Sequence, residues 1–289
     1  MSSSEYHSAD QMALDVSSQE QQDRALSEET LETAVRIFRD AGFVILKDLV
    51  PSEWIERARD DYAEAYWAAW EEEKANNPEK VEGKGFQGIP GEFGAQGMPM
   101  REPFMDELAI ANPWAMQVLD AVMSEDIFIQ LPYGSNTAAP NADPGPQHVH
   151  RDIGAQLLSD LPIATTPHYA VVNIALTEFT PENGSTEIWP GTHRLPDHDT
   201  DESDDLEARA ATMPSVRANM PAGSVVVRDM RMWHRGMPNT TDALRIMLAP
   251  VYTHPLLGSD APTVTVPQGL WEDYSERTRN LCRYNATEE

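Results

Sequence analysis

The segment Gln147-His148-Val149-His150-Arg151-Asp152 places three potential metal ligands within five positions of the chain. Alternate side chains of an extended strand point to the same face, so His150 and Asp152 can reach a single ion. His148 has the same parity, and spacing alone therefore does not decide which two of the three bind. A His-x-Asp pair recurs by chance in many proteins, so the rest of the site has to come from elsewhere in the chain.

A second segment supplies the missing groups. The apolar run Val225-Val226-Val227 is typical of a buried strand, and it leads to Trp233-His234, then to Asn239 and Arg245. Two imidazoles and one carboxylate occupy one face of an octahedral iron(II) and leave three adjacent positions open. 2-Oxoglutarate can chelate through two of these, and dioxygen takes the third.

The far carboxylate of 2-oxoglutarate needs a fixed cation. A guanidinium offers it two parallel hydrogen bonds. Arg245 follows His234 by eleven residues, a spacing that allows one turn and places Arg245 on the next strand, beside the metal. The sequence therefore predicts a site for iron(II) and 2-oxoglutarate.

These segments and three others resemble the phytanoyl-CoA dioxygenase-like iron(II)/2-oxoglutarate oxygenases over about residues 32–252. Each motif is weak alone, but their order and separations are specific. The motifs are Phe38-Arg39-Asp40-Ala41-Gly42-Phe43-Val44-Ile45, Gln147…His150-x-Asp152, Glu182-Asn183-Gly184-Ser185-Thr186, Trp189-Pro190-Gly191-Thr192-His193 and Trp233-His234…Asn239…Arg245. The resemblance implies a mostly β protein, with a double-stranded β-helix (a jelly-roll, cupin-like barrel) and N-terminal helices packed on it.

The resemblance also assigns roles to individual residues. It selects His150 rather than His148 as the first ligand, so that His150, Asp152 and His234 hold iron(II). Arg245 would bind the far carboxylate of 2-oxoglutarate, and Gln147 and Thr186 would contact its metal-binding end. Arg101 resembles a basic residue that some relatives place near this co-substrate.

The implied reaction is oxidation of a small-molecule substrate by dioxygen, with release of succinate and CO2. Hydroxylation of a C–H bond is the expected outcome, and desaturation or ring closure would use the same site. Related halogenases replace the carboxylate ligand by a small residue, so Asp152 favours oxygen chemistry. Two alternatives remain open: a cupin-type metalloenzyme that does not use 2-oxoglutarate, and a non-catalytic barrel protein.

Composition limits the other possibilities. The 289 residues carry a formal net charge of −27, which argues against nucleic acid and anionic membranes as partners. A single cysteine, Cys282, excludes an intrachain disulfide framework and a cysteine-rich metal site. The sequence has no apolar run long enough to span a bilayer and no secretory signal, so we expect a cytoplasmic protein. It does not indicate an oligomeric state.

We expect residues 1–25 to form a disordered polar tail and residues 26–289 to form a single oxygenase domain. Within it, residues 26–125 are predicted to be helical, 126–255 to form the β-barrel core, and 256–289 to be a C-terminal extension. Helices are expected from Ser27 to Gly42, from Pro51 onward and over 103–123. Strands are expected at 43–46, 127–131, 169–176, 224–227 and 245–248. Loops 73–102, 133–147 and 153–168 would carry specificity, and the acidic run 197–207 reads as a solvated segment.

Overall fold

The structure is a computed structural model, and it describes residues 6–78, 97–131, 134–141, 145–153, 166–195, 203–257 and 265–287. The α-helices are α1 (Ser18–Asp23), α2 (Glu28–Ala41), α3 (Ser52–Asn76), α5 (Glu107–Ile110), α6 (Pro113–Val122), α7 (Ser203–Ala210), α8 (Gln268–Asp273) and α9 (Glu276–Leu281). The strands are β1 (Ala13–Asp15), β2 (Phe43–Lys47), β3 (Phe128–Gln130), β4 (Ser135–Ala138), β5 (Tyr169–Ala175), β6 (Glu187–Ile188), β7 (Val216–Arg217), β8 (Val225–Asp229), β9 (His234–Arg235), β10 (Arg245–Leu248), β11 (Val251–Thr253), β12 (Thr265–Val266) and β13 (Ala286–Thr287). Short 3-10 helices lie at Ala9–Met12, Thr192–Arg194 and Pro255–Leu257.

Helix α2 begins and ends where the sequence indicates. The hydroxyl of Ser27 caps it by accepting a hydrogen bond from the backbone N–H of Thr30. Gly42 ends it with a positive φ of 89°, which a residue without a Cβ adopts without strain. The chain then enters β2 directly, so the helix and the strand that it covers are joined by one residue.

Two expectations for the helical region need correction. The helix expected over 103–123 is two helices, α5 and α6, because Asn112 caps a new helix and Pro113 occupies its first turn. The expected tail is ordered over residues 6–25: β1 pairs in parallel with β2, and Met12 is fully buried. The few apolar residues of this segment are anchors for a strand partner that lies far along the chain, which local composition does not reveal.

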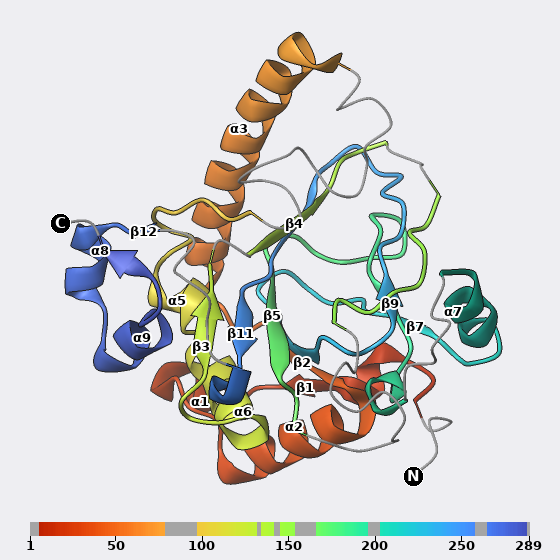
Figure 1. The fold of residues 1–289 in the computed structure, drawn as a ribbon, viewed down its shortest axis with the longest axis horizontal. Coiled ribbons are helices and arrows are strands. Elements are labelled where there is room, and N and C mark those ends of the chain that lie inside the picture. Colours follow the sequence, from red (N-terminus) through yellow and green to blue (C-terminus); the bar gives the residue numbers. More distant parts are fainter. Residues whose placement is uncertain are drawn as a thin grey trace.

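The larger sheet forms the centre of the molecule (Figure 1). Among the described residues it has eight strands in the order β1-β2-β8-β5-β10-β4, with β11 continuing alongside β5 and pairing with β3. Apart from β1 with β2, the pairs are antiparallel. A smaller sheet of β7-β6-β9 faces it. The two sheets are the two layers of the expected jelly roll, although the barrel they make is not closed.

The register of the larger sheet decides which side chains face the smaller one. Directly opposed residues in an antiparallel pair lie on the same face. Arg228 is opposite Val171, and Val171 is also opposite Val251, so these three side chains form one inward row. All three line a cavity between the sheets. The alternate residues, such as Val172 and Val227, are fully buried on the outer face.

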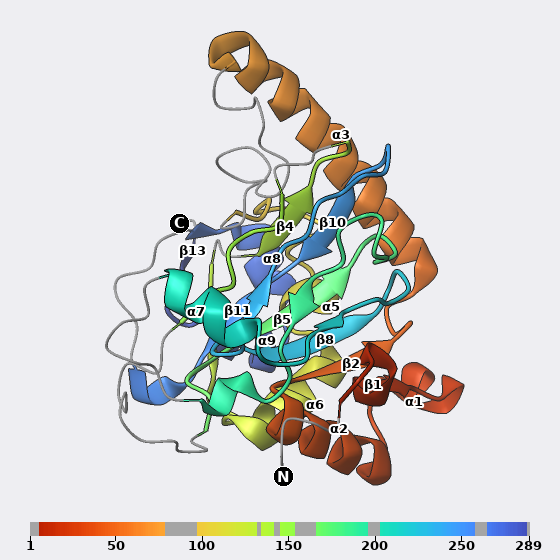
Figure 2. The same ribbon diagram turned by 90° about the vertical axis from the view of Figure 1, so that its right-hand side faces the viewer.

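Helices cover that outer face (Figure 2). Helices α2 and α6 pack on β2 and β8. Helix α3 lies against β4, where the Tyr62 hydroxyl bonds Ser135 and Thr137. Residues of the C-terminal segment, α8 and α9, pack near α5, and the Tyr274 hydroxyl donates to the carbonyl of Met105. None of the described helices has the length and apolar character needed to cross a membrane.

Candidate metal and co-substrate site

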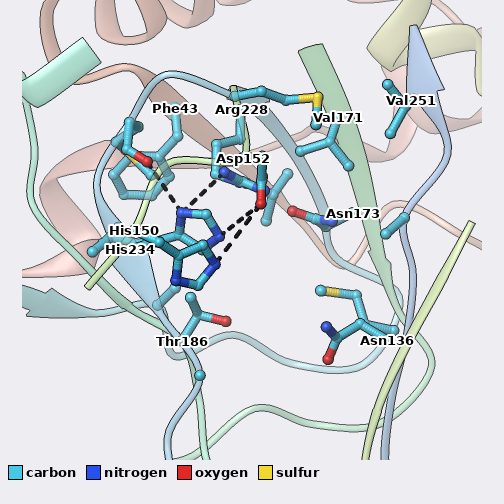
Figure 3. Close-up of a pocket in the computed structure, with 18 of the residues that line it drawn as sticks. Phe43, Asn136, His150, Asp152, Val171, Asn173, Thr186, Arg228, His234 and Val251 are labelled. Carbon is cyan, nitrogen blue, oxygen red and sulfur yellow. Dashed lines mark hydrogen bonds and ion pairs between the residues drawn. The ribbon is translucent and has the colours of Figure 1, made fainter. Parts of the chain in front are cut away.

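The three predicted ligands come together at one side of the cavity (Figure 3). His234 begins strand β9, and His150 pairs with it through two backbone hydrogen bonds of 3.0 Å. The backbone N–H of Asp152 donates to the carbonyl of Met230 at 3.1 Å, which fixes this residue beside the same edge. One ligand atom from each of His150, Asp152 and His234 lies within 4.8 Å of the others.

Backbone carbonyls orient both imidazoles. Nδ1 of His150 bonds the carbonyl of His148 at 2.9 Å, and Nδ1 of His234 bonds the carbonyl of Met232 at 3.1 Å. A carbonyl only accepts, so these bonds place the ring protons on Nδ1 and leave the Nε2 lone pairs available. The Nε2 atoms face Oδ1 of Asp152, at 3.9 Å from His150 and 3.4 Å from His234. Such support from the surroundings is typical of metal-binding histidines.

The local electrostatics favour the protonation states that bind a metal. Burial lowers the pKa of His150, and the neighbouring His234 lowers it further, so the ring is neutral at neutral pH. Burial alone would raise the pKa of Asp152, but Arg228 and His234 hold it well below its usual range. The site therefore offers a neutral imidazole at His150 and an ionised carboxylate at Asp152.

Arg228 is the closest partner of the Asp152 carboxylate. Its Nη2 group donates to Oδ2 of Asp152 at 2.6 Å, and its side chain is 11% exposed. Arg228 extends from β8 of the larger sheet, whereas Asp152 belongs to the segment beside β9. The ion pair therefore joins the two layers at the metal site.

Arg245 lines the same cavity from strand β10. The residue is 2% exposed, and its guanidinium lies over the ring of Phe179 at 4.8 Å and donates one hydrogen bond of 3.3 Å to Asn136. Its Nε and Nη1 groups have no hydrogen-bond partner among the described residues. Burial lowers its pKa to about 10, so it stays protonated at neutral pH. A buried cation with unsatisfied donors is costly, and an anionic ligand in the cavity would satisfy it.

The cavity has a volume of about 370 Å³. Gln147 and Thr186, the other two residues expected at the co-substrate, both line it. The side-chain oxygen of Gln147 accepts from the backbone N–H of Gly236 at 2.8 Å, so its amide nitrogen is the group that can serve a ligand. Thr186 lies beneath the two imidazoles, with Asn136 and Asn173 on the opposite side (Figure 3).

The structure does not bring Arg101 or His148 to the cavity lining. Arg101 is 47% exposed and makes a two-pronged ion pair with Asp61, at 2.6 and 2.8 Å. His148 is 76% exposed and lies 3.7 Å from Glu207. Of the two histidines, only His150 belongs to the cluster of potential ligands among the described residues.

Three further residues of the site were not identified from the sequence. Arg228 pairs with a ligand, although its segment reads as an ordinary apolar strand. Asn173 is buried in β5, and its Nδ2 group has no partner among the described residues; a polar residue inside an apolar strand was the available signal. Glu207, from the acidic run 197–207, accepts from the backbone N–H of Val149 at 2.8 Å and so holds α7 against the ligand segment. Residues 197–202 of that run lie outside the described residues.

Comparison with known proteins shows the family to which this chain belongs. Residues 38–247 match the family described as phytanoyl-CoA dioxygenase (PhyH). The match covers well over half of the chain, and this protein therefore belongs to the PhyH family.

Solved structures share the fold at low sequence identity. The non-heme alpha ketoglutarate dependent carbocyclase SnoK from nogalamycin biosynthesis is 22% identical, with a TM-score of 0.51, covering 79% of this chain and 84% of that one. AviO1 from Streptomyces viridochromogenes Tue57 is 20% identical, with a TM-score of 0.50, covering 78% of this chain and 95% of that one. The expected fold class is confirmed.

The family implies iron(II) and 2-oxoglutarate, and the residues present fit both. Two imidazoles and one carboxylate with their remaining polar atoms already bonded suit a non-haem iron(II). The unsatisfied guanidinium of Arg245, in the same cavity, suits the far carboxylate of 2-oxoglutarate.

Proposed function

We propose that this protein is an iron(II)- and 2-oxoglutarate-dependent dioxygenase that hydroxylates a C–H bond of a small, neutral metabolite or natural-product intermediate, releasing succinate and CO2. The observation that carries the proposal is the buried guanidinium of Arg245, with two unsatisfied donor groups, in the cavity that holds the His150, Asp152 and His234 cluster. A metal site alone would not need this cation.

Different residues of the cavity would bind the iron, bind 2-oxoglutarate and exclude water. His150, Asp152 and His234 would hold the iron, which supplies oxidation of the substrate when it is bound with co-substrate and dioxygen. Arg245 would fix the far carboxylate of 2-oxoglutarate, and Thr186 and Gln147 would orient the end nearer the metal. The apolar side chains between the sheets, including Val171, Met230 and Val251, would keep water out.

The cavity lining supports a neutral substrate. Its charged or titratable side chains, among the described residues, are the two histidines, Asp152, Arg228 and Arg245. Asp152 and Arg228 neutralise each other, and the charge of Arg245 is assigned to 2-oxoglutarate. No ionised side chain of the described lining is left for the substrate, whose polar groups would instead meet amides such as Asn173 and Gln130.

The cupin-type and non-catalytic alternatives do not explain Arg245. A hydrolytic or isomerising metalloenzyme does not require a buried guanidinium in the cavity, whereas an enzyme that binds 2-oxoglutarate does. In a non-catalytic barrel the same group would destabilise the fold without compensation.

The test is an anaerobic titration of the purified protein with iron(II) and then 2-oxoglutarate. Binding of both is expected to produce the visible charge-transfer band of a chelated 2-oxoglutarate, at about one equivalent of each. Succinate release is then measured across neutral, anionic and cationic metabolites, and product mass separates hydroxylation from desaturation or ring closure. Absence of the band in the metal-loaded protein would remove 2-oxoglutarate from the reaction.

A further inference from the structure

Oδ2 of Asp152 is already occupied by the protein. The Nη2 group of Arg228 donates to it at 2.6 Å, while Oδ1 faces the Nε2 atoms of His150 and His234. The two oxygens of one carboxylate therefore have different partners: one points to the ligand cluster and the other to a guanidinium.

Arg228 is held for this role from the opposite layer. It extends from the middle of the larger sheet, where β8 pairs with both β2 and β5. Its neighbours in the inward row are Phe43 and Val171, which offer no competing carboxylate. Its Nη1 group lies 3.4 Å from Nδ1 of His234, but that nitrogen already bonds the carbonyl of Met232. The short hydrogen bond to Asp152 is therefore the contact that orients the guanidinium of Arg228.

We infer that Arg228 is a positioning residue that restricts Asp152 to binding the metal through one oxygen. The inference rests on the proposed function. A carboxylate can bind a metal through one or both oxygens. With one, the triad leaves three coordination positions open, enough for both donor atoms of 2-oxoglutarate and for dioxygen. With both, only two positions remain, and 2-oxoglutarate would fill them. The guanidinium thereby preserves the position that dioxygen needs.

The experiment uses nitric oxide, a paramagnetic probe that needs one vacant position on iron(II). Wild type, Arg228→Met and Arg228→Lys are loaded with iron(II) and 2-oxoglutarate without oxygen and then titrated with nitric oxide by electron paramagnetic resonance. Arg228→Met is expected to weaken nitric oxide binding in the presence of 2-oxoglutarate by about 10- to 100-fold, the usual effect of losing a group that orients a ligand. Without 2-oxoglutarate its nitric oxide signal should persist. Arg228→Lys keeps a donor for Oδ2 and should retain more of the binding than Arg228→Met does.

Arg231→Met is the matched control. Arg231, three residues along the chain, makes an ion pair of the same length, 2.6 Å, with the buried Asp229, and neither residue belongs to the ligand cluster or the cavity lining. The Arg231→Met variant should bind nitric oxide with wild-type affinity, with and without 2-oxoglutarate. Equal nitric oxide affinities of wild type and Arg228→Met, both with 2-oxoglutarate, would overturn the inference. If Arg228→Met does not fold, Arg228→Gln takes its place, because its shorter neutral amide also removes the charged donor from Oδ2. A wild-type nitric oxide affinity of folded Arg228→Gln in the presence of 2-oxoglutarate would then overturn the inference. A wild type that lacks the 2-oxoglutarate band would refute the proposed function, which is a separate outcome.

Discussion

Two arginines line the same wall of the cavity, and they differ in what satisfies them. Arg228 is opposite Val171 at the beginning of β5, and the protein itself supplies its partner, Asp152. Arg245 is two residues before Met247, which is opposite Ala175 at the end of β5. Its Nε and Nη1 groups have no partner among the described residues. The protein itself satisfies Arg228, and we propose that a bound anion satisfies Arg245.

The charge of Arg228 is part of the folded structure, whereas we propose that the charge of Arg245 serves to bind an anion. An ion pair made within the chain contributes to the folded state at all times. A buried cation without a partner lowers stability until an anion arrives, and part of the binding energy of that anion comes from relieving the cost. Substitutions at the two ends of the cavity should therefore have different signatures, and each prediction below tests that contrast.

The largest effect is expected at the metal ligands. His150→Ala, Asp152→Ala and His234→Ala should each abolish turnover and sharply lower iron content, because three protein ligands are few. Iron is measured by metal analysis and the fold by circular dichroism. His148→Ala is the matched control, since it removes an imidazole of the same segment and parity that lies outside the cluster. Full iron content in any of the three variants would remove that residue from the site.

The next effect concerns 2-oxoglutarate at the other end. Arg245→Met should weaken its binding roughly 30-fold to several thousand-fold, since losing one partner of a buried charged pair costs about 2–5 kcal/mol. Iron affinity without co-substrate should barely change. Titration of the charge-transfer band measures both, and Arg245→Lys tests whether charge alone suffices. Because lysine cannot form the two parallel bonds, we expect only partial recovery; an unchanged affinity in Arg245→Met would refute the assignment.

In the metal-free protein, the change in the free energy of unfolding should differ in sign between the Arg228→Met and Arg245→Met variants. Arg228→Met leaves the carboxylate of Asp152 without its cation and should destabilise the protein by about 1–3 kcal/mol. Arg245→Met removes a buried charge with unsatisfied donors and should leave stability unchanged or raise it. Thermal unfolding in the presence of a chelator and without 2-oxoglutarate measures both. Comparable losses of stability in the two variants would mean that Arg245, like Arg228, has an anionic partner in the folded protein.

The contrast also explains what the sequence could and could not predict. His150, Asp152, His234 and Arg245 belong to motifs with fixed spacing, and Ser27 and Gly42 mark a helix by local rules. Arg228 becomes a partner of Asp152 only through the packing of one sheet on the other, 76 residues apart in the chain. The pairing of β1 with β2 is equally non-local. Sequence periodicity does not predict contacts between segments that packing brings together, whereas motifs and helix caps can be recognised from local sequence.

The smallest change in 2-oxoglutarate affinity is expected from substitution of Arg101. The sequence predicted it near the co-substrate, but the structure places its side chain, 47% exposed, against Asp61 and over the ring of Phe104 at 5.3 Å. Exposed ion pairs contribute about 0–1 kcal/mol, because water competes for both charges. Because Arg101 is not among the residues that line the cavity, Arg101→Met should change 2-oxoglutarate affinity by less than about threefold, which corresponds to less than ~0.7 kcal/mol. The same charge-transfer titration measures it beside Arg245→Met, with Arg57→Met as control, because Arg57 makes an exposed pair with Glu102 at 3.2 Å. If Arg101→Met loses 2-oxoglutarate affinity tenfold or more while Arg57→Met does not, Arg101 belongs to the co-substrate site. The distinction between Arg101 and the two cavity arginines would then be wrong.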